Sequence, residues 1–264
     1  MKKITIVGGD RRLKTAKEKL EKSGFYVDSI GLFEKDDGNY QNSDVLLFGV
    51  PTTKDNTTVF CPLTHRIINL SLFENFSDKL FLTANYIFKD KNCIDYCKDD
   101  GYAILNAVPT AEGAISFAIE NTPHTLFKSR VLVIGYGRTG KVLADRLKSL
   151  GCDLTVSARK QQDFALINTL GIKYRNTETL DTDRLHYDII FNTVDCFVLN
   201  KNLNHLKDTL LIDLSSKGGF DLEMAKTLGI KASKLPGIPG KTAPETAGEI
   251  LADTVITLIK GAKI

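Results

Sequence analysis

The feature that most constrains the fold is a glycine pattern directly behind an apolar run. Residues 131–134 read Val-Leu-Val-Ile, and Gly135, Gly137 and Gly140 follow in the spacing G-x-G-x-x-G. Apolar residues at helical spacing continue over 142–150. Strand, glycine turn and helix in this order favour a dinucleotide-binding turn over coincidence. The first glycine permits the tight turn, the second lets the backbone approach a pyrophosphate, and the third lets helix and strand pack closely.

The start of the predicted helix should therefore bind phosphate groups. Free N–H groups and the partial positive charge of a helix N-terminus attract anions. We predict that Arg138 and Thr139 contribute to this site together with the three glycines.

The glycine pattern lies in the middle of the 264-residue chain, so a separate domain should precede it. Apolar runs predict strands at 4–7, 25–30, 45–50, 80–83 and 104–105, then at 131–134, 154–157, 189–192, 210–214 and 232–233. Helical or polar segments separate them, and such alternation is typical of parallel sheets with right-handed crossovers. The predicted fold is α/β with two Rossmann-like domains: a substrate-side domain at 1–122 and a nucleotide domain at 123–264.

Two helices should join these domains. Pro109 at the start, Thr110 as N-cap and Glu112 early in the first turn predict a connecting helix over 109–121. Residues 245–260 carry a broad apolar face, which predicts a final helix that crosses both domains.

Composition narrows the function classes. The net charge is +3 with acids and bases intermixed, and no apolar run is long enough for a bilayer, so neither nucleic acid nor membrane is an expected partner. The five cysteines are scattered, and Cys93-x-x-x-Cys97 has no second ligand pair nearby. This favours reduced thiols in a cytoplasmic protein without a metal site.

The end of the second nucleotide strand bears on the choice of cofactor. Ser157-Ala-Arg159-Lys160 stands where an NAD site usually carries an acidic residue for the ribose hydroxyl. Ser157 can donate to a 2′-phosphate, Arg159 can face it with a planar guanidinium, and Lys160 adds charge. We predict NADP as the cofactor; a solvated basic turn is the alternative.

The next two strands also end in polar residues. Asn192, Thr193 and Val194 are expected near the nicotinamide ribose. Asp213 and Ser215 are costly to bury unless paired, so they should line a cleft, although an N-cap and turn cluster would explain them equally well.

Two further segments have suggestive chemistry. Residues 235–244 hold glycines and prolines that fix a backbone path near the predicted site. Arg12, at a helix start after Gly8-Gly9, suits a carboxylate, although a solvated arginine is the more common meaning of this spacing.

With these pieces placed, the chain resembles the dipicolinate synthase family, in its dehydrogenase-like component, over nearly its full length. The matching motifs are Gly8-Gly9-Asp10-x-Arg12, Asn106-x-x-Pro109-Thr110-x-Glu112-Gly113-x-Ile115, the glycine turn with Arg138-Thr139, Ala158-Arg159, Asn192-Thr193, Asp213-x-Ser215-Ser216 and Pro236-Gly237-x-Pro239-Gly240-x-x-Ala243-Pro244-x-Thr246-Ala247-Gly248.

The resemblance implies a two-domain dehydrogenase that oxidises a dihydrodipicolinate-type compound to dipicolinate during sporulation. The implied partners are a nicotinamide cofactor and a flavodoxin-like second subunit, in the mother-cell cytoplasm of a spore-forming bacterium. The resemblance further implies a dicarboxylate bound by Arg12, Lys217 and Lys241, with Thr110 and Glu112 as motif residues on the substrate side.

Two positions depart from the family pattern. Asp195 stands where the family often has proline, and Lys217 stands where it tends to have arginine. A lysine weakens any bidentate carboxylate contact.

Other functions are compatible with the same motifs. One is a two-domain NADP oxidoreductase of the shikimate or methylene-folate dehydrogenase kind. Another is a non-catalytic NADP-binding module that regulates a partner. The pattern assigns no proton-transfer residue and leaves a homo-oligomer open.

Overall fold

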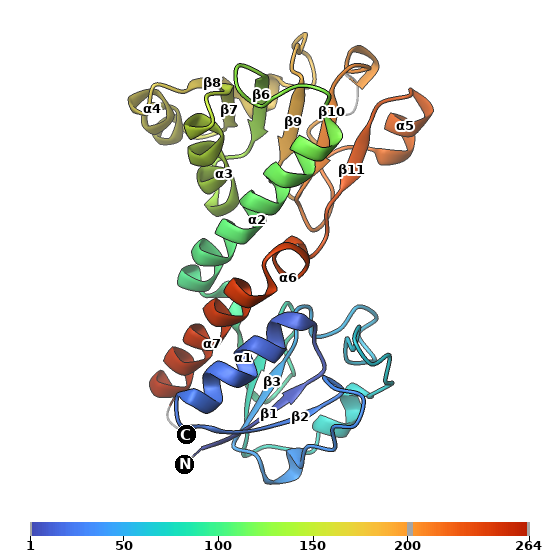
Figure 1. Ribbon diagram of the computed structural model, residues 1–264, viewed down its shortest axis with the longest axis vertical. Helices are drawn as coiled ribbons and strands as arrows, with labels where there is room; N and C mark the ends of the chain where they lie inside the picture. The colour runs from blue at the N-terminus through green and yellow to red at the C-terminus, as the bar shows by residue number, and fades with distance from the viewer. Residues whose placement is uncertain (1, 200–202, 263–264) are drawn as a thin grey trace. The chain divides into compact units, whose positions relative to one another are not determined.

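The computed structural model describes residues 2–199 and 203–262 (Figure 1). The chain forms two compact units, Met1–Asn106 with Pro239–Ile264, and Ala107–Ile238. Each unit contains one parallel sheet, so the predicted α/β class with two parallel sheets is confirmed. Among the described residues, no helix is long and apolar enough to cross a membrane.

The first unit is built on a five-stranded sheet in the order β2-β1-β3-β4-β5. Its strands are β1 (Lys3–Val7), β2 (Tyr26–Ile30), β3 (Val45–Phe48), β4 (Leu80–Thr83) and β5 (Asn92–Asp95). Its longer helices are α1 (Arg11–Lys22) and α7 (Pro244–Gly261), and its short 3-10 turns are Tyr40–Asn42, Leu70–Phe73 and Tyr96–Lys98.

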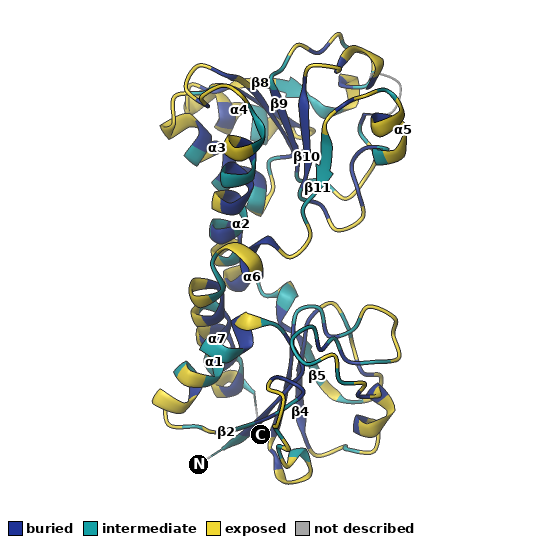
Figure 2. Ribbon diagram, turned by 45° about the vertical axis from the view of Figure 1, so that its right-hand side comes forward, coloured by how far each residue is buried: buried dark blue, intermediate teal, exposed yellow. Residues whose placement is uncertain are grey.

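Strand alternation divides the core of this unit into two layers. Val45 and Leu47 of β3 face a cluster that includes residues of α1 and α7, whereas Leu46 and Phe48 face a cluster rich in phenylalanine. Side chains of a strand point alternately to opposite faces, so a continuously apolar strand predicts burial on both. All four residues of β3 and all four of β4 are buried, and Figure 2 colours the middle of this sheet dark blue.

The second unit is built on a six-stranded sheet in the order β11-β10-β9-β6-β7-β8 (Figure 1). Its strands are β6 (Arg130–Ile134), β7 (Asp153–Ala158), β8 (Lys173–Asn176), β9 (Ile189–Asn192), β10 (Leu210–Asp213) and β11 (Ala232–Lys234). Its helices are α3 (Arg138–Ser149), α4 (Gln161–Thr169) and α5 (Leu222–Thr227), with 3-10 turns at Thr177–Thr179 and Leu203–His205. The strand order reverses between β6 and β9, which is the arrangement of a Rossmann fold.

Helix α2 differs from the prediction because it begins earlier. It spans Asp100–Asn121, with Pro109 inside it rather than at its entry. Asp99 accepts the N–H of Tyr102 at 2.7 Å and so caps the true start. The predicted strand at 104–105 is therefore wrong, and Thr110 is not an N-cap. Leu105, whose carbonyl loses its helical donor at Pro109, is half exposed, so water can replace that donor.

The C-terminal helix α7 also corrects the predicted domain boundary. The sequence places it in the nucleotide domain, but residues from Pro239 onward belong to the first unit. Helices α1 and α7 lie side by side (Figure 1). Leu251, Ala252, Val255 and Ile259 share one buried cluster with residues of α1, so the apolar face is covered within this unit. Short α6 (Ile238–Thr242) begins at the point where the chain leaves the second unit.

Candidate nucleotide-binding site

The glycine turn has the conformation that its sequence predicts. Gly135 follows β6 with φ +98°, a value that L-residues with side chains rarely adopt, and its N–H donates to the Ser157 carbonyl at 3.0 Å. A Cβ added to Gly140 would lie 2.1 Å from the Gly135 carbonyl oxygen. Only glycine at this position lets α3 approach the strand so closely.

The start of α3 is open and polar. Gly137 is the N-cap residue, is exposed, and has no atom within 4 Å of the place where a Cβ would stand. A glycine offers no side chain to cap the first N–H groups of the helix, so an anion can approach them. Arg138 is also exposed at this end. The residues present therefore fit a pyrophosphate group.

The loop after β9 packs directly on this turn. A Cβ on Gly135 would meet Val194 Cγ1 at 2.6 Å and Thr193 Oγ1 at 2.7 Å. The Thr193 hydroxyl donates to the Ile134 carbonyl at 2.8 Å. Because β6 and β9 flank the reversal in strand order, Thr193 and Val194 lie where ligands bind in open parallel sheets.

The end of β7 separates the three residues predicted to bind a 2′-phosphate. The strand continues to Ala158, and Ser157 is fully buried. Thr177, which the sequence did not single out, donates to the Ser157 hydroxyl oxygen at 3.0 Å. Arg159 and Lys160 follow the strand and are exposed to solvent. Ser157, in contrast, is buried and accepts a hydrogen bond from Thr177 of the same unit.

A buried network joins the ends of β9 and β10. Asp213 accepts hydrogen bonds from the Asn192 amide at 2.9 Å, from the Ser215 N–H and hydroxyl at 3.0 and 2.7 Å, and from the Gly219 N–H at 3.0 Å. The Asn192 amide also donates to the Val194 carbonyl at 2.8 Å. The contacts of Asp213 and Ser215 are therefore those of a turn cluster, which was one of the two interpretations of the sequence. The network holds the loops after β9 and β10 in place.

Gly219, which the sequence pattern did not single out, completes this network. A Cβ there would lie 2.0 Å from the Asn192 amide nitrogen. The adjacent Gly218-Gly219 pair was the only local signal for such a close approach.

Asp195 and Lys217, the two departures from the family pattern, meet in the structure. The Asp195 carboxylate accepts the N–H groups of Ser216 and Lys217 at 2.7 and 3.1 Å. Burial alone would raise the pKa of Asp195, but the hydrogen bonds from Lys217 and Ser216 lower it below its usual value. An ionised Asp195 thus fixes the backbone from which the exposed Lys217 side chain projects.

Arg12 and Lys241, two of the predicted substrate-side residues, belong to the first unit. Arg12 is 3% exposed; its Nε and Nη2 donate to Asp10 at 2.9 and 2.7 Å, and Nη2 also donates to the Val50 carbonyl at 3.0 Å. The Arg12 guanidinium is therefore bound by groups of its own unit, and almost none of it is exposed to a ligand. Lys241 is exposed on α6.

Thr110 and Glu112 both lie on α2, where Glu112 pairs with Arg146 of α3 at 3.3 Å. The ion pair connects α2 to α3, which carries the glycine turn. It is a surface pair, so its contribution to stability is small.

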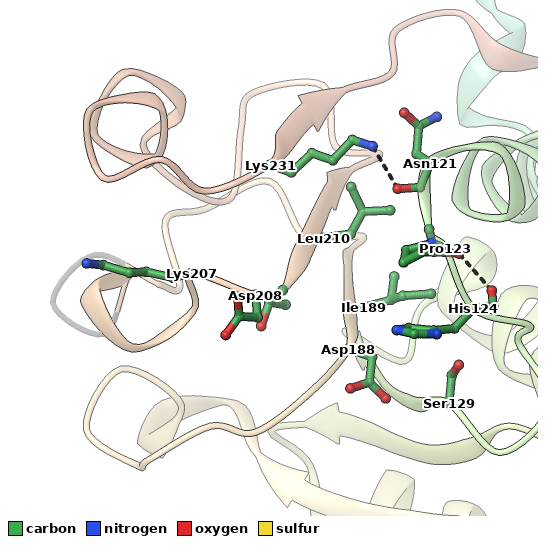
Figure 3. Close-up of a pocket in the computed structure, with 12 residues that line it drawn as sticks. Asn121, Pro123, His124, Ser129, Asp188, Ile189, Lys207, Asp208, Leu210 and Lys231 are labelled. Atoms are coloured by element: carbon green, nitrogen blue, oxygen red, sulfur yellow. Dashed lines mark hydrogen bonds between the residues drawn. The ribbon is translucent and has the colours of Figure 1, made fainter.

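A cavity of about 480 Å³ lies elsewhere in the second unit (Figure 3). It is lined by Ser129, Asp188 and Thr209, which precede β6, β9 and β10, and by Lys231, whose ammonium donates to the Asn121 carbonyl at 2.7 Å. The cavity thus opens at the amino ends of the strands, opposite the edge that carries Gly135. It is not the nucleotide site. Within 2–199 and 203–262, no group of three His, Cys, Asp or Glu residues could hold a metal ion.

Comparisons with known proteins agree with this architecture. No family model matches the chain. The dipicolinate synthase A subunit of Bacillus subtilis is 30% identical, with 97% of this chain and 95% of that protein aligned. The crystal structure of the dipicolinate synthase A subunit from Bacillus halodurans superposes with a TM-score of 0.90 at 28% identity, covering 98% and 97% of the two chains.

A more distant neighbour shares the fold alone. D-lactate dehydrogenase of Escherichia coli superposes with a TM-score of 0.63 at 14% identity, covering 99% of this chain and 98% of that one. The overall fold is thus shared with a dehydrogenase. Together with the identity and coverage of the Bacillus subtilis relative, these results show that the chain belongs to the family of dipicolinate synthase A subunits.

Proposed function

We propose that this protein is an NADP-dependent dehydrogenase that oxidises dihydrodipicolinate to dipicolinate. The observation that carries the proposal is the exposed start of α3, free of a side-chain cap at Gly137, at the switch point of a Rossmann sheet. Membership of the dipicolinate synthase family supports the choice of substrate.

The chain offers distinct groups for each part of a dinucleotide. Backbone N–H groups of Arg138, Thr139 and Gly140 would bind the pyrophosphate. Arg159 and Lys160 would bind the 2′-phosphate, and the loop of Thr193 and Val194 would border the nicotinamide ribose. The buried groups of Ser157, Asn192, Asp213 and Ser215 support these loops and are not proposed to contact the cofactor.

The reaction removes two electrons and two hydrogens from the substrate ring. When bound, NADP supplies the acceptor for one hydrogen and both electrons. The other hydrogen leaves as a proton. Because the product ring is aromatic, its formation is favourable, and the protein's task is positioning and charge. Lys217, whose backbone is fixed by Asp195, provides a cation for a substrate carboxylate.

A direct assay tests this function. Purified protein supplied with dihydrodipicolinate and NADP should form dipicolinate and reduced nicotinamide in equal amounts. The assay should be run with and without the flavodoxin-like second subunit that we propose as partner. Tight NADP binding with no turnover in either case would instead support a non-catalytic module. Turnover restricted to shikimate-type or folate substrates would exclude the proposed substrate.

The preference for NADP should depend on Arg159. Replacing Arg159 with alanine removes a charged contact worth about 1.5–3 kcal/mol when fully made, less in solvent, so NADP affinity should fall about tenfold. NAD affinity should change less than about twofold, because NAD lacks the phosphate. Calorimetric titration measures the NADP and NAD affinities. Arg184→Ala, which changes another exposed arginine of the same unit, is the matched control. An equal loss for both nucleotides would refute the assignment.

A further inference from the structure

The first unit has its own switch point, between β1 and β3. Gly8 and Gly9 follow β1 there, and the loop after β3 is seated on them. The Gly9 N–H donates to the Phe60 carbonyl at 2.8 Å, and a Cβ on Gly8 would lie 2.6 Å from Val59 Cγ1. In open parallel sheets this edge is where ligands bind.

A cavity of about 490 Å³ opens in this loop, within the size range of small-molecule sites. The residues lining it include Lys54, Asp55, Thr58, Phe60, Cys61 and His65. Lys54 Nζ lies 4.1 Å from the centre of the Phe60 ring, so the ammonium is held over one face of that ring. Lys54 and His65 are exposed, and Cys61 is buried.

The one carboxylate among these residues is already engaged by the loop. Asp55 accepts the N–H groups of Thr57 and Thr58 at 2.8 and 2.7 Å and the Thr58 hydroxyl at 2.6 Å. These bonds hold the loop in shape and satisfy the negative charge locally. The remaining polar groups of the cavity therefore include the Lys54 ammonium and the His65 imidazole, both of which can donate an N–H to an anion.

We propose that this cavity binds a planar ring carboxylate. The carboxylate pairs with Lys54 and His65, and the ring packs against the edge of Phe60, because Lys54 lies over the face of Phe60. The Lys54 ammonium selects the acid, and packing against the edge of Phe60 selects a flat ring over a flexible chain. The site rests on the proposed function only in the choice of dipicolinate as the member of this class, and binding can be measured without turnover.

The test is calorimetric titration of the full-length protein with dipicolinate, without nucleotide and in metal-free buffer. Lys54→Gln and His65→Gln should each weaken binding about fivefold or more. Lys14→Gln is the matched control, because Lys14 lies over the Phe33 ring at 5.1 Å in the same unit but outside this cavity. Its affinity should equal that of the wild type. Because Lys54 and His65 are exposed, their variants should keep the wild-type melting temperature.

Glutarate, an acyclic dicarboxylate, tests the ring requirement and should bind at least tenfold more weakly than dipicolinate. Absence of dipicolinate binding, or equal affinity in all three variants, would overturn the proposal. The two proposals fail separately. If the wild type binds dipicolinate, Lys54→Gln loses that binding, and no oxidation is detected, the proposed binding site is supported and the proposed dehydrogenase function is refuted. If the protein oxidises dihydrodipicolinate but Lys54→Gln has unchanged dipicolinate affinity and unchanged KM, the dehydrogenase function is supported and the proposed binding site is refuted.

Discussion

Replacing Gly140 with alanine should abolish measurable nucleotide binding and destabilise the second unit. The new methyl group would stand 2.1 Å from the Gly135 carbonyl oxygen and 2.9 Å from its carbon, and both atoms belong to the backbone. Neither can rotate away, so α3 must shift from β6. Overpacking of this kind costs about 1–3 kcal/mol or more. Urea unfolding and calorimetric titration with NADP measure the two effects.

Gly137→Ala is the matched control, since it separates folding from binding. Gly137 has φ −80° and no protein atom within 4 Å of the Cβ position, so alanine should leave the unfolding midpoint unchanged. Nucleotide affinity should nevertheless fall about tenfold or more, because the methyl group occupies the approach to the helix start. A Gly140→Ala protein with wild-type stability and affinity would show that the close approach of α3 is not required.

Replacing Arg12 with alanine should lower the stability of the first unit by about 3 kcal/mol. Removing one member of a buried ion pair leaves the other charge uncompensated. Arg12 is almost wholly buried, and Asp10 also caps α1 by accepting the Arg12 N–H at 3.1 Å. A Cβ on Gly240 would lie 2.6 Å from Asp10 Oδ2, so the segment before α7 covers the pair. Urea unfolding measures the loss of stability. Arg11→Ala, which changes the exposed neighbouring arginine, is the control.

The same variant decides between two roles for this arginine. A structural role predicts a lower unfolding midpoint for Arg12→Ala. At a temperature where the variant remains folded, its KM for substrate should then change little. The substrate-binding role predicted from the sequence requires the opposite: wild-type stability and an apparent substrate affinity reduced about tenfold.

Strands buried on both faces could be predicted closely from the sequence. β4 and β9 lie at residues 80–83 and 189–192 as predicted, because every side chain in them is buried and most are therefore apolar. The edge strand β8, Lys173–Asn176, carries polar, half-exposed residues and left no such signal. The start of α2 was missed because its cap, Asp99, lies ten positions before the proline that suggested an entry.

The glycine turn was predictable because its geometry is local, set by Gly135 and its sequence neighbours. Ser157 was not, because β7 continues one residue further than predicted, to Ala158, and the side chain of Ser157 is fully buried. Arg12 depends on Val50 and Gly240, which are distant in sequence. No local pattern indicates that a chain returns from another unit to cover an arginine.

The return of α7 to the first unit has a consequence for biosynthesis. The core shared by α1 and α7 needs residues from both ends of the sequence, whereas residues 107–238 are contiguous. On the ribosome, the unit that is translated first must wait with the apolar face of α1 uncovered until Leu251, Val255 and Ile259 emerge. The nucleotide-binding unit can close earlier, so the usual order of N-terminal domain before C-terminal domain is reversed.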